Sequence, residues 1–498
     1  MSIKNNLIAN YASQLYTAAV GILILPLYIK YMGAEAYGLV GFFAMLQAWF
    51  ALLDLGLTPT IGRETARFFG GSMTALAYRQ LYRALSVIFV TIALVGGGAL
   101  FFTAEPVAHQ WLKVDALPMS EVVFAVQVMA ISVALRWLTG LYRGVVTGAE
   151  QLVWLSAFNA IIATLRFIGV FASMYFYGFT PKVFFLHQLV VAIIEQLGLW
   201  WKSHQILPKK EQYQTAIGWS FQPVKPVLKF ALTIAFTSSV WVLVTQTDKL
   251  ILSGILPLAE YGYFTLAVLV ASGIMTLSGP VSSVIMPRMA RLHVEGKHDE
   301  MISVYRGATQ IVSVVAGSAG ICIAFFAKPL LYAWTGDQAI THEAAPILQL
   351  YALGNAILAV SAFPYYLQYA LGNLRYHLIG NAITVITLIP AIIWAASHFG
   401  GVGAGWAWLG INAAYTVLWV GYVHKKLEPG LHVKWFINDV LKIYLPVIAL
   451  LIPFIYWPLS IENRWLLFGV MGIIGCAALA LSSLSAEAVR TKLKNKFG

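Results

Sequence analysis

The sequence has little charge. Only 10% of its 498 residues are Asp, Glu, Lys or Arg, whereas ordinary globular domains carry about 25%. Hydrophobic residues make up 60%, and no stretch is long and polar enough to form a soluble domain. The two cysteines, Cys322 and Cys476, lie inside apolar runs, where they are most simply small packing residues. These shortages exclude a soluble globular protein and indicate an all-α integral membrane protein.

Long apolar runs recur along the whole chain. Because a helix needs about 20 apolar residues to cross a bilayer, each such run is read as one transmembrane helix. We expect fourteen, near residues 7–30, 37–58, 84–103, 121–142, 152–178, 183–201, 228–256, 261–286, 304–327, 345–368, 376–397, 403–423, 443–459 and 465–485. The first run is longer than the core of a signal peptide and lacks a small-x-small cleavage pattern, so we expect it to be retained.

Basic residues are distributed unequally between the two sides that these spans define. Of the 32 Lys and Arg residues, 24 lie in one set of loops and termini, five lie in the other set, and Arg136, Arg166 and Lys249 lie inside spans. Cytoplasmic loops are enriched in Lys and Arg, so both termini are predicted to be cytoplasmic. The same asymmetry accounts for the net charge of +12, and no nucleic-acid partner is needed to explain it.

The two halves of the chain share short matches at one offset of 224 residues. Tyr37-Gly38 matches Tyr261-Gly262, Ala66-Arg67 matches Ala290-Arg291, and Tyr142 and Gly148 match Tyr366 and Gly372. The offset contains six spans, an even number, which predicts parallel repeats related by an axis along the membrane normal, with a substrate path between them. We expect a six-helix bundle in 1–202, a cytoplasmic linker in 203–225, a second six-helix bundle in 226–424, and two extra helices with a basic cytoplasmic tail in 425–498.

Arg166 is the only charged residue between Trp154 and Gly178, at the middle of that run. Twelve residues on each side place it roughly 18 Å from either end, too far for its side chain to reach a head-group region. On a helical wheel it shares a small, polar face with Asn159 and Ser173. A cation at this depth costs about 3 kcal/mol on insertion scales, so it is either a binding group or a structural partner of a buried carboxylate.

Other charged residues inside spans are further candidates. Arg136 and Lys249 are candidate substrate-binding cations, although Arg136 could also reach the inner interface. Asp248 and Lys249 are adjacent on one helix, about 100° apart, and are therefore not expected to neutralise each other. Because Asp248 lies about 27 Å along the helix from Phe230, near the outer edge of the bilayer core, both side chains could instead reach the interface. Four groups could couple ion movement or act as charge partners: Asp54, His187, Glu195 and Asp248. Glu195 and His187, two helical turns apart, could carry protons or could pair with Arg166 or Arg136. Asp54, near the inner end of its span, could equally be a cap.

Enzyme motifs are scarce. The histidines have no metal-ligand spacing, and the glycine-rich run 401–405 lies between two apolar spans, so it indicates a turn and no phosphate loop. Three glycines in the last span, Gly469, Gly472 and Gly475, predict close helix packing. The basic tail from Arg490 to Lys496 predicts an anchor to inner-surface lipids. These features favour a transporter over an enzyme.

Several short motifs resemble a known family. They are Asn10-Tyr11 with Leu25-Pro26-Leu27-Tyr28, Gly33-Ala34-Glu35-Ala36-Tyr37-Gly38, Leu53-Asp54-Leu55-Gly56-Leu57 followed by Arg63 and Arg67, Leu141-Tyr142-Arg143-Gly144, and Thr247-Asp248-Lys249-Leu250-Ile251-Leu252. With them the chain resembles polysaccharide-biosynthesis exporters, and in particular Wzx-type O-antigen flippases of the multidrug/oligosaccharidyl-lipid/polysaccharide (MOP) superfamily. The resemblance covers nearly the whole chain, and its motifs mark the family better than the substrate.

This resemblance implies two six-helix bundles around a central cavity and movement of an undecaprenyl-diphosphate-linked oligosaccharide across a bacterial inner membrane by alternating access. It implies no resident cofactor, and a proton or sodium gradient could drive transport. The implied partners are the lipid-linked glycan, membrane lipids and other polysaccharide-assembly membrane proteins. Two alternatives stay open: a cation-coupled drug exporter, which should favour acidic groups in its cavity, and a polysaccharide polymerase or ligase, which should carry a large periplasmic loop.

Overall fold

The computed structural model describes residues 3–212, 216–218 and 221–490. In this part of the chain the only β-pairing is an isolated bridge between Lys113 and Pro257, and the rest of the regular structure is helical. Within the described ranges, twelve helical segments are long and apolar enough to cross a membrane. One of them, Arg375–Leu427, contains a break at Gly400 and covers two expected spans. The all-helical membrane fold is confirmed, and the count of fourteen stays a prediction.

Packing divides the chain into two compact units, Met1–Gly262 and Tyr263–Gly498. The first unit contains α1 (Ile3–Leu23), α2 (Leu25–Met32), α3 (Ala34–Phe50), η1 (Ala51–Asp54), α4 (Leu57–Phe69), α5 (Ala75–Phe102), α6 (Ala104–Pro106), η2 (Val107–Trp111), α7 (Met119–Gly148), α8 (Leu152–Thr164), η3 (Leu165–Gly169), α9 (Val170–Tyr177), α10 (Pro181–Ile206), η4 (Lys210–Gln212), η5 (Gln222–Val224) and α11 (Lys225–Ile255). The boundary falls inside α12 (Leu258–Val294), so the first turn of that helix belongs to the first unit.

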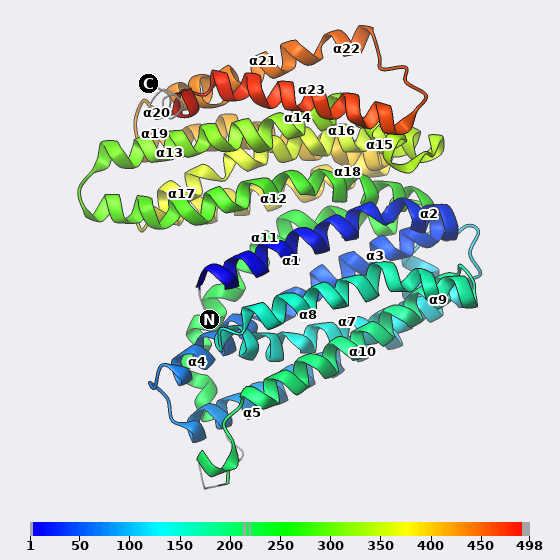
Figure 1. Cartoon of the computed structure of the whole chain (residues 1–498), viewed down its shortest axis with the longest axis vertical. Coiled ribbons are helices and arrows are strands. Elements are labelled where there is room, and N and C mark those ends of the chain that lie inside the picture. The colour runs from blue at the N-terminus through cyan, green and yellow to red at the C-terminus, as the bar shows by residue number, and fades with distance from the viewer. Residues whose placement is uncertain (1–2, 213–215, 219–220, 491–498) are drawn as a thin grey trace. The chain divides into compact units, whose positions relative to one another are not determined.

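The second unit contains the rest of α12 and the helices that follow it (Figure 1). These are α13 (His298–Val312), η6 (Ser313–Gly317), α14 (Ser318–Phe325), α15 (Ala327–Thr335), α16 (Gln338–Ser361), α17 (Phe363–Ala370), α18 (Arg375–Ala414), η7 (Tyr415–Trp419), α19 (Val420–Leu427), α20 (Leu431–Lys434), η8 (Trp435–Leu441), α21 (Lys442–Leu451), α22 (Pro453–Tyr456) and α23 (Arg464–Ser485). Whether 1–202 and 226–424 superpose as repeats stays a prediction.

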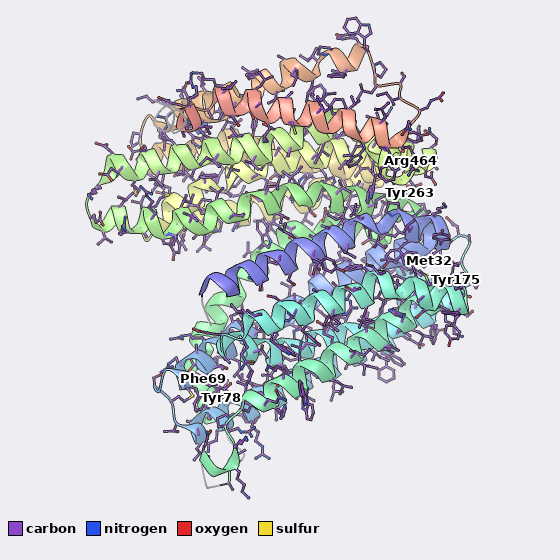
Figure 2. The ribbon with its side chains drawn as sticks, viewed as in Figure 1. Met32, Phe69, Tyr78, Tyr175, Tyr263 and Arg464 are labelled. Carbon is purple, nitrogen blue, oxygen red and sulfur yellow. The ribbon has the colours of Figure 1, made fainter. Side chains whose placement is uncertain are left out.

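The helices of the first unit begin and end at two opposite ends of the bundle. Met32 and Tyr175 lie at one end, and Phe69 and Tyr78 lie at the other (Figure 2). Met32 lies in a loop that the sequence places outside, and Tyr175 lies near the outer end of its expected span. Phe69 and Tyr78 lie in a stretch between spans that the sequence places inside. The expected linker packs on the inner end of α5, where the Arg79 Nε donates to the Pro208 carbonyl at 2.9 Å. Residues 213–215 and 219–220 of that linker, and 491–498 of the basic tail, lie outside the described residues.

A reciprocal contact joins the first turns of α3 and α12. A Cβ added to Gly38 would lie 2.1 Å from the Leu258 carbonyl oxygen, and a Cβ added to Gly262 would lie 2.8 Å from the Ala34 carbonyl oxygen. Gly38 and Gly262 are equivalent at the offset of 224 residues, and so are Ala34 and Leu258. Only glycine allows the two backbones to approach this closely.

Two expectations about glycines are wrong. Residues 401–405 do not form a turn but belong to a helical segment, and the break lies one residue earlier, at Gly400, where φ is 59°. The expectation of close packing at Gly469, Gly472 and Gly475 is wrong, because a Cβ added to any of them would meet no atom of the described chain within 4 Å. Spacing alone predicted a packed face, but this side of α23 has no neighbour there.

Candidate functional site

Arg166 lies in a π-helical turn, η3, in the middle of the expected fifth span. A π-turn widens the helix by one residue and leaves carbonyl groups without their usual partners. The Leu165 carbonyl accepts a hydrogen bond from His187 Nε2 at 2.9 Å, and the Arg166 carbonyl accepts one from Gln188 Nε2 at 3.0 Å. Both donors belong to α10. The irregular backbone at this depth is therefore satisfied by side chains of a neighbouring helix.

The break in span one faces the same turn. Pro26 interrupts the expected first span, which the structure divides into α1 and α2. Tyr28, two residues later, is buried and donates its hydroxyl to the Phe167 carbonyl at 2.9 Å. The Tyr28 ring also stacks on Phe171, with centroids 5.3 Å apart. Two irregular helices thus pack against each other at one level, and three consecutive carbonyls of η3 accept bonds from other helices.

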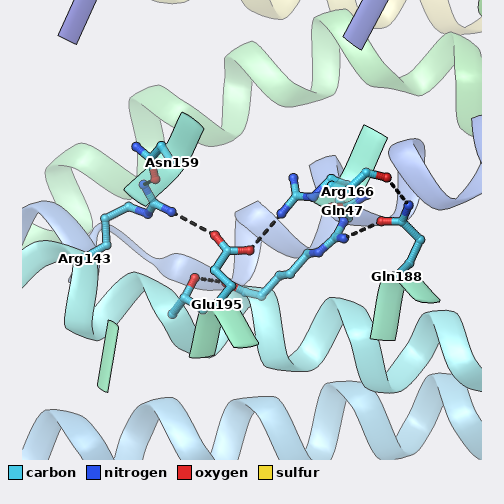
Figure 3. Close-up of polar contacts among 8 residues, drawn as sticks. Gln47, Arg143, Asn159, Arg166, Gln188 and Glu195 are labelled. Carbon is cyan, nitrogen blue, oxygen red and sulfur yellow. Dashed lines mark hydrogen bonds and ion pairs between the residues drawn. The ribbon is translucent and has the colours of Figure 1, made fainter. Parts of the chain in front are cut away.

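Glu195 bridges two arginines (Figure 3). Its Oε2 accepts a hydrogen bond from Arg166 Nη2 at 2.8 Å, and its Oε1 accepts one from Arg143 Nη2 at 3.0 Å. The other guanidinium nitrogen of Arg143, Nη1, donates to Asn159 Oδ1 at 2.9 Å. The side chain of Glu195 is 8% exposed, while those of Arg166 and Arg143 are 24% and 33% exposed. The carboxylate is therefore enclosed, and both arginines remain partly accessible.

Arg136 is held by neutral groups. It donates from Nη1 to Gln47 Oε1 at 2.6 Å and from Nη2 to Gln188 Oε1 at 2.9 Å, and its guanidinium lies 5.0 Å from the centroid of the Phe43 ring. Gln188 also donates from Nε2 to the Arg166 carbonyl, so both polar atoms of its side-chain amide have a partner. Arg136 therefore lies inside the bundle, and the alternative that it reaches the inner interface is wrong.

The network formed by Arg136, Arg143, Arg166 and Glu195 has unbalanced charge. Three guanidinium groups and one carboxylate give it a net charge of +2. Among the described residues, the buried Nε atoms of Arg136 and Arg166 have no hydrogen-bond partner. Guanidinium groups stay protonated in proteins and bind carboxylates and phosphates through several parallel donors. The network is therefore suited to a multiply charged anion.

Arg143 is the member of the network that sequence reasoning missed. It lies near the inner end of its span and was counted among loop residues, yet it belongs to α7 and faces Glu195. The available signal was its spacing of two helical turns from Arg136, which places both arginines on one face of α7. Asn159, Arg166 and Ser173 do share the expected polar face, since all three bond to groups on α7 or α10.

Lys249 and Asp248 stand outside this network. The expectation that adjacent positions keep them from neutralising each other is wrong, because Lys249 Nζ lies 3.4 Å from Asp248 Oδ1. The lysine side chain turns back along α11 and donates to the Thr245 carbonyl at 2.6 Å, and this path brings the ammonium beside the carboxylate. Lys249 therefore remains a predicted substrate contact that is separate from the three arginines.

The remaining candidates for ion coupling have local partners. Asp54 accepts hydrogen bonds from the Thr58 amide at 3.1 and 3.3 Å and therefore caps the start of α4, as its alternative role predicted. His187 must carry its proton on Nε2, which faces a carbonyl, so the Nδ1 of its neutral form accepts from the Ser173 hydroxyl at 2.8 Å. No metal-binding group of three His, Cys, Asp or Glu residues occurs in the described ranges. The coupling roles stay predictions.

Comparison with protein families identifies the chain. The model of the family described as "Polysaccharide biosynthesis protein" matches residues 3–293, more than half of the sequence. The chain belongs to this family. A sequence relative is the "Uncharacterized membrane protein EpsK" of Bacillus subtilis (strain 168), which is 21% identical over 369 residues, or 73% of this chain and 71% of EpsK. The predicted membership of the polysaccharide exporters is confirmed.

Comparison with solved structures shows that this chain has the fold of the MOP superfamily. The inward closed conformation of the lipid II flippase MurJ matches with a TM-score of 0.70 and 15% identity, covering 96% of this chain and 97% of MurJ. An inward-facing multidrug resistance MATE family transporter of the MOP superfamily matches with a TM-score of 0.60 and 13% identity, covering 82% of this chain and 94% of the transporter. At these identities the likeness concerns the fold alone.

Proposed function

We propose that the protein is a flippase that moves an undecaprenyl-diphosphate-linked oligosaccharide from the inner to the outer leaflet of a bacterial inner membrane by alternating access. One observation carries the proposal: the membrane-embedded network around Glu195 contains three arginines and one carboxylate. A diphosphate diester has one negative charge on each phosphate, which matches the network's excess of two positive charges. Family membership and the likeness to a lipid II flippase support a lipid-linked cargo.

The backbone around Arg166 supports the same proposal. In membrane transporters, irregular helix backbone occurs where it is buried in protein or lines a cavity, and broken helices commonly form the binding site. The break at Pro26 and the π-turn η3 contact each other beside the arginines. Side chains held by such a frame bind a ligand with little loss of conformational entropy. We propose that Arg136, Arg143 and Arg166 bind the diphosphate, while Lys249 contributes from a separate position.

The cargo distinguishes this function from its alternatives. A drug exporter that carries cations should surround its substrate with carboxylates, and here arginines outnumber them. A polymerase or ligase would need catalytic groups, whereas the arginines offer binding and charge compensation.

We further propose that a proton or sodium gradient drives transport. Vesicles in which each gradient is collapsed separately by an ionophore should show which one is required.

The decisive experiment compares Arg166→Lys, Arg166→Gln, and Arg166→Gln combined with Glu195→Gln. Each variant is reconstituted into vesicles with a defined lipid-linked oligosaccharide, and both membrane abundance and the fraction of cargo reaching the opposite leaflet are measured. We expect Lys to retain part of the transport, because it keeps the charge and loses the planar fork. Gln should lose nearly all of it at normal abundance. A loss of abundance in Arg166→Gln that the double variant restores would instead indicate that Arg166 is a structural partner of Glu195.

A control and a contrary result complete this test. Arg291→Gln removes an arginine whose side chain is 69% exposed, and it should transport normally. Transport at the original level in Arg166→Gln would refute a substrate role for the residue. A cationic drug transported in place of the lipid-linked sugar would favour the drug-exporter alternative. If Arg166→Gln transports normally, Lys249 and Arg136 become the candidates for substrate contact.

The proposed orientation places both termini and Lys210 in the cytoplasm and Gln338 in the periplasm. Single cysteines at these positions, in a variant without Cys322 and Cys476, can be labelled with an impermeant thiol reagent in intact cells. We expect labelling at position 338 and protection at position 210. The reverse pattern would refute the orientation.

A further inference from the structure

Glu195 occupies the place that an anionic ligand would take. Each of its two oxygens accepts a hydrogen bond from a different arginine, at 2.8 Å from Arg166 and 3.0 Å from Arg143. The two guanidinium groups come from α7 and from η3, which lie in consecutive expected spans, and the carboxylate of α10 is the group that joins them (Figure 3). A phosphate presents oxygens to arginine in the same bidentate manner. The carboxylate and an incoming phosphate therefore compete for the same donors.

Arg136 differs from the other two arginines in this respect. Its partners, Gln47 and Gln188, are neutral amides, so its charge is solvated by the protein without being compensated by a contacting carboxylate. Two of the three cations are thus occupied by an internal anion in the free protein, and the third is not. An incoming anion can bind Arg136 first and reach Arg143 and Arg166 only by separating them from Glu195.

We infer that Glu195 is a displaceable internal counter-ion that sets how tightly the cargo is held. The inference rests on the proposed function. When the diphosphate binds, Arg143 and Arg166 exchange one anionic partner for another of similar strength, so binding gains little from them. When the cargo reaches the outer leaflet, Glu195 takes both guanidinium groups back and promotes release. The site selects a cargo with two negative charges, because one charge must replace Glu195 at Arg143 and Arg166 while the other binds Arg136.

A purely structural role for Glu195 makes the opposite prediction. If the carboxylate only holds α7, η3 and α10 together, its removal should disorder the arginines and weaken anion binding. If it is an internal competitor, its removal should strengthen anion binding and slow release. The two roles therefore differ in the sign of one affinity change.

The test uses the full-length protein in nanodiscs, with farnesyl diphosphate as the probe and farnesol as its uncharged control. Glu195→Gln should bind farnesyl diphosphate about tenfold more tightly than the wild type, the lower range of what a charge-assisted hydrogen bond contributes. Affinity for farnesol should not change. In vesicles, the same variant should turn over the lipid-linked oligosaccharide more slowly. Unchanged or weaker diphosphate binding by Glu195→Gln would overturn the inference.

A second pair of variants covers the case in which Glu195→Gln does not fold because Arg143 and Arg166 repel each other. Arg143→Gln removes that repulsion, so Arg143→Gln with Glu195→Gln is compared with Arg143→Gln alone. Tighter binding by the double variant supports the competitor role, and equal or weaker binding overturns it. A wild type that binds farnesyl diphosphate no better than farnesol would refute the proposed function itself, which distinguishes the two failures.

Discussion

The two units bury ionic groups in different proportions. In the first unit, beside the separate pair of Lys249 and Asp248, two arginines share one carboxylate, Glu195, and a third, Arg136, has only neutral partners. In the second unit, the buried Asp439 receives one arginine, Arg306, through two hydrogen bonds of 2.8 and 3.0 Å. Gln310 completes the second site with a bond of 2.7 Å. An unbalanced network has charge available for a ligand, whereas a balanced pair serves packing.

The difference is also seen when residues of the two halves are compared at the predicted repeat offset. At the offset of 224 residues, the charged residues Arg136, Arg143, Arg166 and Glu195 correspond in order to Val360, Leu367, Pro390 and Trp419. The polar groups that the second unit buries inside its spans are largely neutral, such as Asn355, which bonds to the Ala271 carbonyl and to the Trp408 indole. The four charged residues of this network therefore have uncharged counterparts at the predicted offset.

The largest effect is expected where the balanced pair is broken. Arg306→Gln leaves Asp439 buried without its cation, which costs about 3–5 kcal/mol and should sharply lower membrane abundance. Adding Asp439→Asn should restore both abundance and transport, because no charge remains to be paired. Immunoblotting of membranes and vesicle transport measure the two outcomes. Rescue of abundance without transport would mean that the second unit also uses its charge for function.

In the first unit, charge removal should affect transport more than stability. Arg136→Gln removes the cation that no carboxylate contacts, so we expect transport to fall by about 30-fold while abundance stays near the original level. Arg136→Lys should be intermediate. The matched control is Val360→Leu, a change at the equivalent position of the second half. Equal losses in both halves would contradict the difference between them.

The reciprocal glycine contact predicts unequal effects in the two halves. Gly38→Ala places a Cβ 2.1 Å from a backbone oxygen and should cost about 1–3 kcal/mol, whereas Gly262→Ala, at 2.8 Å, should cost less. Gly98→Ala is the control, because a Cβ there meets no atom of the described chain within 4 Å. Thermal unfolding in detergent ranks the three variants. A larger loss for Gly98→Ala would show that the contact does not limit stability.

The smallest effect is expected at a surface pair of the second unit. The hydrogen bond from Lys297 lowers the pKa of the exposed Glu295 carboxyl below its ordinary value. A lowered pKa means that the pair stabilises the fold above the ordinary carboxyl range and that this contribution disappears as pH falls through the lowered value. Because both groups are exposed, Glu295→Gln should leave the melting temperature unchanged at neutral pH. A clear decrease would indicate a hidden structural role.

The sequence predicted the class of fold because hydrophobic length and charge asymmetry depend on the bilayer alone. It also predicted that Arg166 could pair with Glu195, since a cation at that depth needs a partner. It could not predict the π-turn, because the residues around Arg166 are nearly all apolar and show no clear periodicity whose shift would reveal an extra residue. The ion pair of Lys249 and Asp248 was missed because a helical wheel gives only the direction in which a side chain leaves the helix. It does not show that a long side chain such as lysine can fold back toward its neighbour.

The π-turn η3 also makes the number of residues between Leu165 and Gly169 matter. An α-helix advances about 100° per residue, so one deletion here would rotate everything after it relative to everything before it. The deletion would also restore regular helical hydrogen bonds to the carbonyls of η3. His187, Gln188 and Tyr28 would then lose their acceptors. A relative that aligns with a single-residue gap at this point should therefore have lost the three donors, or should carry its cation on another helix.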